Sequence, residues 1–128
     1  MFKVGYLNGN VGVIGSLWNF HGYGPVATTN LNWGDPSCVC MGARMAVDDY
    51  GRIYSPDPFR FAVNVLDANG QLVGRLGRYG NADDPGLSLA WGAYCSYSGD
   101  RLFIGDTSNR RVMMVDATPA NAVTVEVN

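Results

Sequence analysis

The chain has 128 residues, a formal net charge of −2 and a hydrophobic content of 47%. This length gives room for one small domain, and this hydrophobic content excludes a disordered tail. The slightly acidic balance argues against nucleic acid as a partner, and no apolar run reaches the roughly 18 residues that a membrane span needs. The 17 glycines and 6 prolines indicate short elements joined by tight turns, which favours β structure. None of these features identifies a cellular compartment.

Residues 1–34 are predicted to hold the third and fourth strands of a partial first repeat and the crossover after it. Within them, NGNVGVIGSLWNFHGYG is similar to the later stretch NGQLVGRLGRYG. The pair Trp33-Gly34 then corresponds to Trp91-Gly92. We therefore expect the chain to begin at the third strand of a repeat.

Residues 35–43 are predicted to form an insertion loop. Trp33 and Asp57 are 24 positions apart, whereas Trp91 and Asp106 are 15 apart, so the earlier repeat holds nine additional residues. The loop contains DPSCVC, which carries two of the three cysteines.

Three interpretations of Cys38 and Cys40 stay open. They could ligate a metal ion, but a zinc site usually takes four nitrogen or sulfur ligands, so His21 and Cys95 would have to complete the set. One of them could form a disulfide with Cys95, which requires adjacent strands to lie close together. We favour the third interpretation, in which both are buried, unreactive thiols.

Residues 44–80 and 93–128 are predicted to be two complete copies of one repeat, joined by a crossover at residues 81–92. RIYSPDPFRFAVNVLDA aligns with RLFIGDTSNRRVMMVDA when Asp57 is placed on Asp106, a shift of 49 positions. We expect first strands at residues 44–48 and 93–97, and tight turns at 50–51 and 99–100. A second strand, a polar turn and a third strand follow in each copy. Fourth strands are expected at residues 71–76, after the Asn69-Gly70 hairpin turn, and at residues 122–127.

The third strands alternate between apolar and other residues with a period of two, which is typical of strands and not of helices. Phe61, Val63 and Val65 share one face, and Val112 and Met114 share the matching face in the second copy.

Four antiparallel strands that recur every 49 residues are typical of a β-propeller blade. The predicted fold class is therefore all-β, with four-stranded antiparallel meanders that form a partial propeller of about two and a half blades. A simple two-sheet sandwich is the alternative. Propellers close with about four to eight blades, so the missing blades come either from a longer chain or from self-association.

The polar turn of the second copy resembles the NHL repeat. The run D-x-x-N-x-R-V that starts at Asp106 lies between LFIG and VMMVD, as in that motif. The first copy departs from the motif, with Arg60 where asparagine is expected and Ala62 where arginine is expected. The resemblance covers residues 44–128 and implies a six-bladed propeller, which agrees with the expected missing blades.

In an up-and-down meander, the polar turns and the crossovers emerge at the same end, and loops on a rigid scaffold commonly carry binding residues. The candidate binding face comprises Asp57, Arg60, Asp106, Asn109, Arg110, Trp33, Asp83 and Asp84. The polar turn could instead serve only to shape the chain, because Asp, Asn and Arg side chains readily bond to nearby backbone groups. Asp83 and Asp84 could bind calcium or act as acid and base, although carboxylates beside Pro and Gly are more often turn formers.

The leading functional hypothesis is a noncatalytic module that recognises a protein, a peptide or another ligand on this face, with no cofactor. The alternative is part of a metal-dependent propeller enzyme of the lactonase or lyase type, as similarity in fold implies. Such a site would need carboxylates or histidines from several inner strands, and these copies offer mainly Asp48. A purely structural repeat is the third hypothesis.

Overall fold

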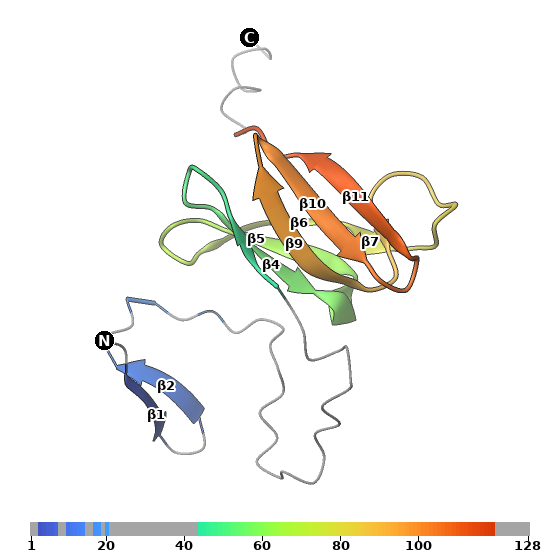
Figure 1. The fold of residues 1–128 in the computed structure, drawn as a ribbon. Helices are drawn as coiled ribbons and strands as arrows, with labels where there is room; N and C mark the ends of the chain where they lie inside the picture. The colour runs from blue at the N-terminus through green and yellow to red at the C-terminus, as the bar shows by residue number, and fades with distance from the viewer. Residues whose placement is uncertain (1–2, 8–9, 15–16, 19, 21–43, 120–128) are drawn as a thin grey trace, which may run out of the picture.

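A computed structural model describes residues 3–7, 10–14, 17–18, 20 and 44–119. Strands β1 (Lys3–Leu7) and β2 (Asn10–Ile14) pair as an antiparallel two-stranded sheet. Figure 1 shows them in blue near the N-terminus.

The first complete copy of the repeat forms a four-stranded antiparallel sheet in chain order. Its strands are β3 (Ala46–Val47), β4 (Ile53–Asp57), β5 (Ala62–Leu66) and β6 (Leu72–Leu76). A short 3-10 helix, η2 (Pro58–Arg60), joins β4 to β5. Gly70 has φ of 78° in the β5–β6 turn, so the predicted hairpin obtains its left-handed residue from glycine.

The second copy forms a three-stranded antiparallel sheet from β9 (Gly92–Ser98), β10 (Arg101–Asp106) and β11 (Arg111–Asp116). Its predicted fourth strand, residues 122–127, lies outside the described residues. The segment between the two sheets contains a short parallel pair, β7 (Arg78–Tyr79) with β8 (Ser88–Leu89), where only a crossover was expected. The described chain is thus all-β, as predicted, and built mainly of antiparallel sheets. Over the described ranges no helix is long and apolar enough to cross a membrane.

The polar turns of the two copies end in the same way, with a left-handed residue whose amide donates three residues back. Phe61 and Arg110, which are 49 positions apart, have φ of 54° and 53°. The amide of Phe61 donates to the carbonyl oxygen of Pro58, and the amide of Arg110 donates to that of Thr107, at 3.1 and 3.2 Å. The 49-residue register is therefore confirmed in three dimensions here. The prediction that Phe61 belongs to the third strand was wrong, because this left-handed residue ends the turn and β5 begins one residue later.

The two copies differ in the pairing of their first and second strands, β3 with β4 and β9 with β10. Ala46 pairs with Tyr54 in one sheet, and Ser96 pairs with Phe103 in the other. Tyr54 and Phe103 are 49 positions apart, whereas Ala46 and Ser96 are 50 apart, because the β3–β4 turn is one residue longer. The predicted equivalence of residues 44–48 with 93–97 was therefore off by one residue, a shift that exchanges the two faces of a strand.

The two larger sheets pack face to face, as Figure 1 shows. Val63 from the four-stranded sheet and Leu102 and Ile104 from the three-stranded sheet are completely buried in this core. The rings of Tyr54 and Tyr97 stack with their centroids 6.5 Å apart. Removal of this apolar surface from water is the main favourable term that holds the sheets together.

Val63 and Val112 occupy equivalent positions in the repeat and provide a matched test. Val63 is fully buried, whereas Val112 is 69% exposed. Val63→Ala should lower the free energy of unfolding by about 2 kcal/mol through lost burial and a residual cavity. Val112→Ala should change it by less than about 0.5 kcal/mol. Urea unfolding followed by circular dichroism would measure both, and equal losses would contradict this packing.

Candidate functional site

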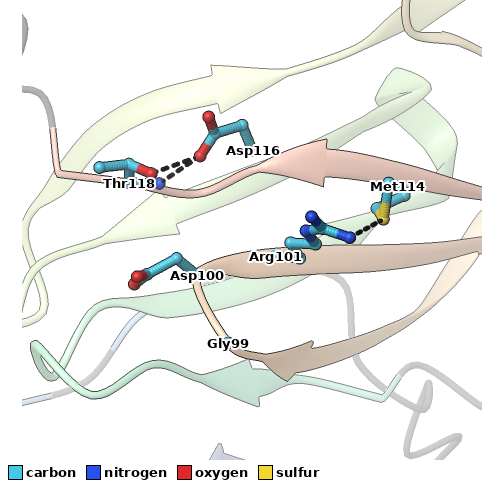
Figure 2. Close-up of a pocket in the computed structure, with 6 residues that line it drawn as sticks. All are labelled: Gly99, Asp100, Arg101, Met114, Asp116 and Thr118. Atoms are coloured by element: carbon cyan, nitrogen blue, oxygen red, sulfur yellow. Dashed lines mark hydrogen bonds between the residues drawn. The ribbon is translucent and has the colours of Figure 1, made fainter.

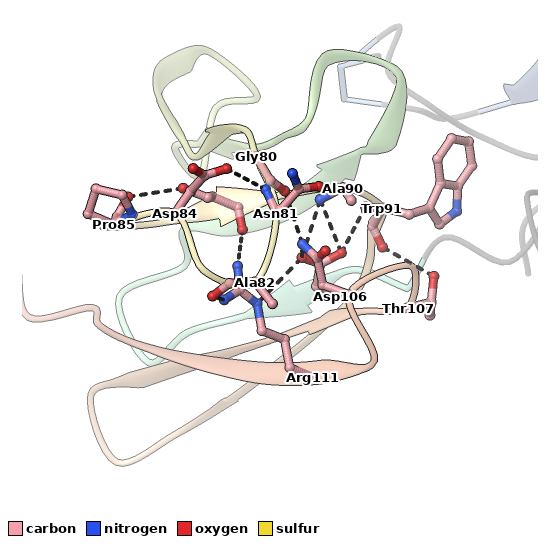
Figure 3. Close-up of polar contacts among 12 residues, drawn as sticks. Gly80, Asn81, Ala82, Asp84, Pro85, Ala90, Trp91, Asp106, Thr107 and Arg111 are labelled. Atoms are coloured by element: carbon pink, nitrogen blue, oxygen red, sulfur yellow. Dashed lines mark hydrogen bonds and ion pairs between the residues drawn. The ribbon is translucent and has the colours of Figure 1, made fainter.

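Asp106, at the end of β10, is the centre of a buried polar network. Its side chain is fully buried. Its Oδ1 accepts hydrogen bonds from the amides of Trp91, at 2.8 Å, and Ala90, at 3.2 Å. Its Oδ2 accepts one from Asn109 Nδ2 at 2.7 Å. Figure 3 shows these bonds converging on the carboxylate from the connecting segment and from the β10–β11 turn.

Asn109 and Arg111 extend the network along the connecting segment. Asn109 Nδ2 also donates to the carbonyl oxygen of Gly80 at 3.0 Å. Arg111 Nη1 donates to the carbonyl oxygen of Ala82 at 2.8 Å, and Nη2 donates to that of Ser88. The network therefore fastens residues 80–91 to the second copy of the repeat. This geometry supports the structural interpretation of the polar turn, in which Asp106 and Asn109 bind the chain itself.

The first copy uses the same turn with different side chains. Asp57 is buried and accepts a hydrogen bond from Arg60 Nη1 at 2.7 Å. Asn64 Nδ2 lies 3.5 Å from the same carboxylate oxygen. The Arg60 side chain is 62% exposed, so its guanidinium remains accessible while one nitrogen pairs with Asp57.

Trp91 links the polar turns of the two copies. Its carbonyl oxygen accepts hydrogen bonds from the amide of Thr107 at 3.0 Å and from Thr107 Oγ1 at 3.3 Å. Its ring contacts Phe59 edge to face, with centroids 5.4 Å apart. Phe59 belongs to η2 in the first copy and is 63% exposed. Figure 3 shows the Trp91 ring directed away from the Asp106 network.

The structure thus assembles a site that sequence reasoning identified only in part. We call Phe59, Trp91 and Thr107, which these contacts join, together with the exposed Arg60 and Arg110 of the same two turns, the aromatic turn site. Arg60 and Arg110 were predicted, and both are exposed in the turns that meet at Trp91. Neither Trp91 nor Phe59 was among the predicted binding residues. The available signal was a large aromatic residue placed between Pro58 and Arg60, in a turn where burial is not expected.

A groove of about 390 Å³ adjoins this site. Thr107, Arg110 and Arg111 line it on the side of the turn, and Tyr94 and Val112 line it on the side of the sheet. Gly105 and the buried Asp106 complete its lining, which combines charged with apolar groups, a mixture common in binding sites.

Of the other predicted residues, two lie in an exposed bend, one lies in the core and four lie outside the described residues. Asp84 is exposed, and its Oδ2 accepts a hydrogen bond from the amide of Asn81 at 2.6 Å, as expected of a turn former (Figure 3). Asp83 is exposed in the same bend. Trp33, Cys38, Cys40 and His21 lie outside the described residues.

Cys95 is a buried free thiol in the core between the sheets. Burial raises the pKa of the thiol to about 12, which keeps it protonated at neutral pH. No group of three or more His, Cys, Asp or Glu residues that could hold a metal ion occurs in the part of the chain that the structure describes.

The carboxylate of Asp48, which was considered for an inner metal site, accepts hydrogen bonds from neighbouring residues of the chain. Burial alone would raise its pKa. Hydrogen bonds from the amides of Arg52 and Tyr50, the Arg52 guanidinium and the Tyr54 hydroxyl outweigh burial and hold the pKa of Asp48 below its usual value. Arg52 also donates to the carbonyl oxygen of Ala117, so Asp48 helps to join the two sheets.

A second pocket, of about 420 Å³, lies at the opposite end of the three-stranded sheet, around the β9–β10 turn and the end of β11 (Figure 2). Asp116 there accepts hydrogen bonds from the amide and hydroxyl of Thr118. Asp67, which lies 49 positions before Asp116, accepts the equivalent hydrogen bond from the amide of Asn69. Asp116 is therefore explained as a turn-forming residue of the repeat.

Comparison of the sequence with protein-family models and with curated proteins found no match. The resemblance to NHL repeats therefore rests on the motif residues alone.

Asp106 and Asp57 are equivalent residues with unequal partners, which gives a second matched test. Asp106→Ala would leave the partly buried amides of Ala90 and Trp91 without acceptors and should cost about 3 kcal/mol. Asp57→Ala removes a pair with the exposed Arg60 and should cost about 1 kcal/mol. Denaturant unfolding of both variants would measure the difference, and a smaller cost for Asp106→Ala would contradict the assigned network.

The hydrogen bonds that Asp48 accepts should make the free energy of unfolding depend on pH in the acidic range. Because folding lowers the pKa of Asp48, its stabilisation is present above the pKa of the unfolded chain and is lost as pH falls through the lower folded value. The free energy of unfolding of the native chain should therefore fall more steeply below about pH 4 than that of Asp48→Asn. Urea titrations at a series of acidic pH values would show this, and parallel profiles would overturn it.

Proposed function

We propose that this chain is part of an NHL-like β-propeller that acts as a noncatalytic binding module, and that its aromatic turn site recognises an acidic peptide segment of a protein partner. The observation that carries the proposal is the Phe59–Trp91 pair, flanked by turns that expose Arg60 and Arg110. Aromatic residues and arginine dominate the energy of protein interfaces, because they combine large contact area with directional polar bonds.

The arrangement of the strands supports the propeller over the sandwich. Each of the two larger sheets is made of consecutive strands, and a single connecting segment passes from one sheet to the next. Sandwiches with Greek-key connections exchange strands between their sheets instead. The further blades would come from a longer chain or from self-association.

The charge and position of the site support a peptide ligand. Arg60 and Arg110 would favour carboxylates, while Phe59 would pack against an apolar or aromatic ligand side chain. The polar networks below the site hold both turns in place before a ligand binds, which reduces the ordering cost of association.

The alternative of a metal-dependent propeller enzyme would require carboxylates open to a metal ion. The buried carboxylates Asp48, Asp57 and Asp106 all accept hydrogen bonds from the chain. We therefore retain the binding hypothesis as the leading one.

Selection from a pool of random peptides on the immobilised 128-residue chain tests the proposal. We expect enrichment of peptides that combine Asp or Glu with an aromatic residue, and weaker binding as salt concentration rises. Phe59→Ala and Arg60→Ala should each weaken a selected peptide about 10-fold, which corresponds to about 1.4 kcal/mol.

Tyr50→Ala provides the control. Tyr50 is 56% exposed and lies in the β3–β4 turn, at the other end of strand β4 from η2. The proposal is wrong if no peptide is enriched, or if Tyr50→Ala weakens binding as much as Phe59→Ala does.

A further inference from the structure

The β5–β6 turn contains an asparagine that is placed to react with its own backbone. Asn69 is exposed and is followed by Gly70. Among the described asparagines, it alone precedes a glycine. Glycine has no Cβ, so its backbone nitrogen can approach the preceding side chain with little steric hindrance. Asn69 is therefore the described asparagine whose side chain is most open to attack by the backbone nitrogen that follows it.

The reaction in question is a ring closure followed by hydrolysis. The backbone nitrogen of Gly70 bonds to Cγ of Asn69, the Cγ–Nδ2 bond breaks, and the proton of the Gly70 amide leaves with Nδ2 as ammonia. Water then opens the cyclic succinimide that remains. Opening at the backbone carbonyl leaves an isoaspartate, in which the main chain runs through the side-chain carbon, and opening at Cγ leaves an aspartate. Water is the only co-reactant, and nothing is oxidised or reduced.

The folded turn holds the attacking nitrogen in a hydrogen bond. The amide of Gly70 donates to the carbonyl oxygen of Asp67 at 3.0 Å. Oδ1 of Asp67 accepts hydrogen bonds from the amides of Asn69 and Gln71, each at 2.9 Å. Because the Gly70 nitrogen must lose its proton to attack Cγ, the turn has to open before the ring can close.

We propose that Asn69 is a site of spontaneous conversion to isoaspartate, and that opening of the β5–β6 turn sets the rate. The side chain of Asp67 controls this opening, because it binds the amides of the residues on both sides of Gly70. The reaction is independent of ligand binding at the aromatic turn site.

The product does not fit the folded turn. Isoaspartate lengthens the backbone before Gly70 and places a second carboxylate close to Asp67. The Gly70 backbone already lies against the Trp18 ring, because a Cβ added to Gly70 would be 2.4 Å from Trp18 Cδ2. Trp18 Nε1 also donates to the carbonyl oxygen of Ala68 at 3.2 Å. The longer turn has to shift relative to Trp18, so the isoaspartate form should unfold at a lower urea concentration than the native chain.

Incubation of the 128-residue chain at mildly alkaline pH, followed by trypsin digestion and mass spectrometry with electron-transfer fragmentation, tests the proposal. Trypsin releases residues 61–75 as one peptide, because Arg60 and Arg75 flank it, and this peptide contains both Asn69 and Asn64. We expect isoaspartate at Asn69 and none at Asn64, which is buried and precedes a valine. Unfolding of the chain in urea should speed the conversion by about 10-fold or more, because the turn is then open.

Asp67→Ala and Asp116→Ala form a matched pair of variants. Asp67→Ala removes the acceptor of two turn amides and should speed the conversion of Asn69 in the folded chain about 5-fold. Asp67→Asn keeps an acceptor oxygen and should speed it less. Asp116 accepts the equivalent hydrogen bond from Thr118 in the other copy, so Asp116→Ala should leave the rate at Asn69 unchanged. In urea, all three variants should convert at the rate of the native chain.

Three results would overturn the proposal. The first is the absence of conversion at Asn69 in the urea-unfolded chain. The second is conversion in the folded chain as fast as in the unfolded chain, which would show that the turn does not control the rate. The third is an equal effect of Asp67→Ala and Asp116→Ala on the rate at Asn69.

Discussion

The buried carboxylate of Asp106 is the interaction on which the arrangement of this protein depends. A carboxylate removed from water is costly unless its oxygen atoms are bonded, and here two backbone amides and an asparagine side chain satisfy them. Those amides belong to Ala90 and Trp91, at the end of the segment that joins the two larger sheets. Asp106 thereby determines where the second sheet begins and where the Trp91 ring lies relative to the first.

The two copies of the repeat show how one backbone can carry different surfaces. Both polar turns use a buried aspartate and a left-handed residue, Phe61 or Arg110, at the same position. In the second copy, the Asn109 side chain donates hydrogen bonds to Gly80 and Asp106 within the protein. In the first copy, Arg60 occupies that position and extends toward solvent. The shared geometry maintains the turn, and the exchanged side chain leaves a guanidinium exposed in the first copy.

Much of the local structure could be predicted from the sequence, because it depends on short-range chemistry. The strands that flank the polar turns, the Asn69-Gly70 hairpin and the 49-residue period follow from alternation, turn residues and self-similarity. The extra residue in the β3–β4 turn was missed, since alignment by residue type does not detect a change of turn length.

The candidate site was predicted only in part, because it depends on contacts between distant segments. Arg60 and Arg110 lie in turns that the motif identifies. The meeting of Phe59 with Trp91 depends on the packing of two sheets and on the path of the segment between them. Side-chain type alone contains no information about that path, so the sequence does not predict that Trp91 contacts Phe59.

Amide hydrogen exchange of the 128-residue chain, resolved by residue with NMR, tests the central role of Asp106 most directly. The amides of Ala90 and Trp91 lie outside the larger sheets, yet they donate to a buried carboxylate. They should be protected to the same extent as the core amide of Ile104, because all three become exposed only when the sheets separate. Rapid exchange of Ala90 and Trp91, at the rate of the exposed bend at residues 82–86, would contradict it.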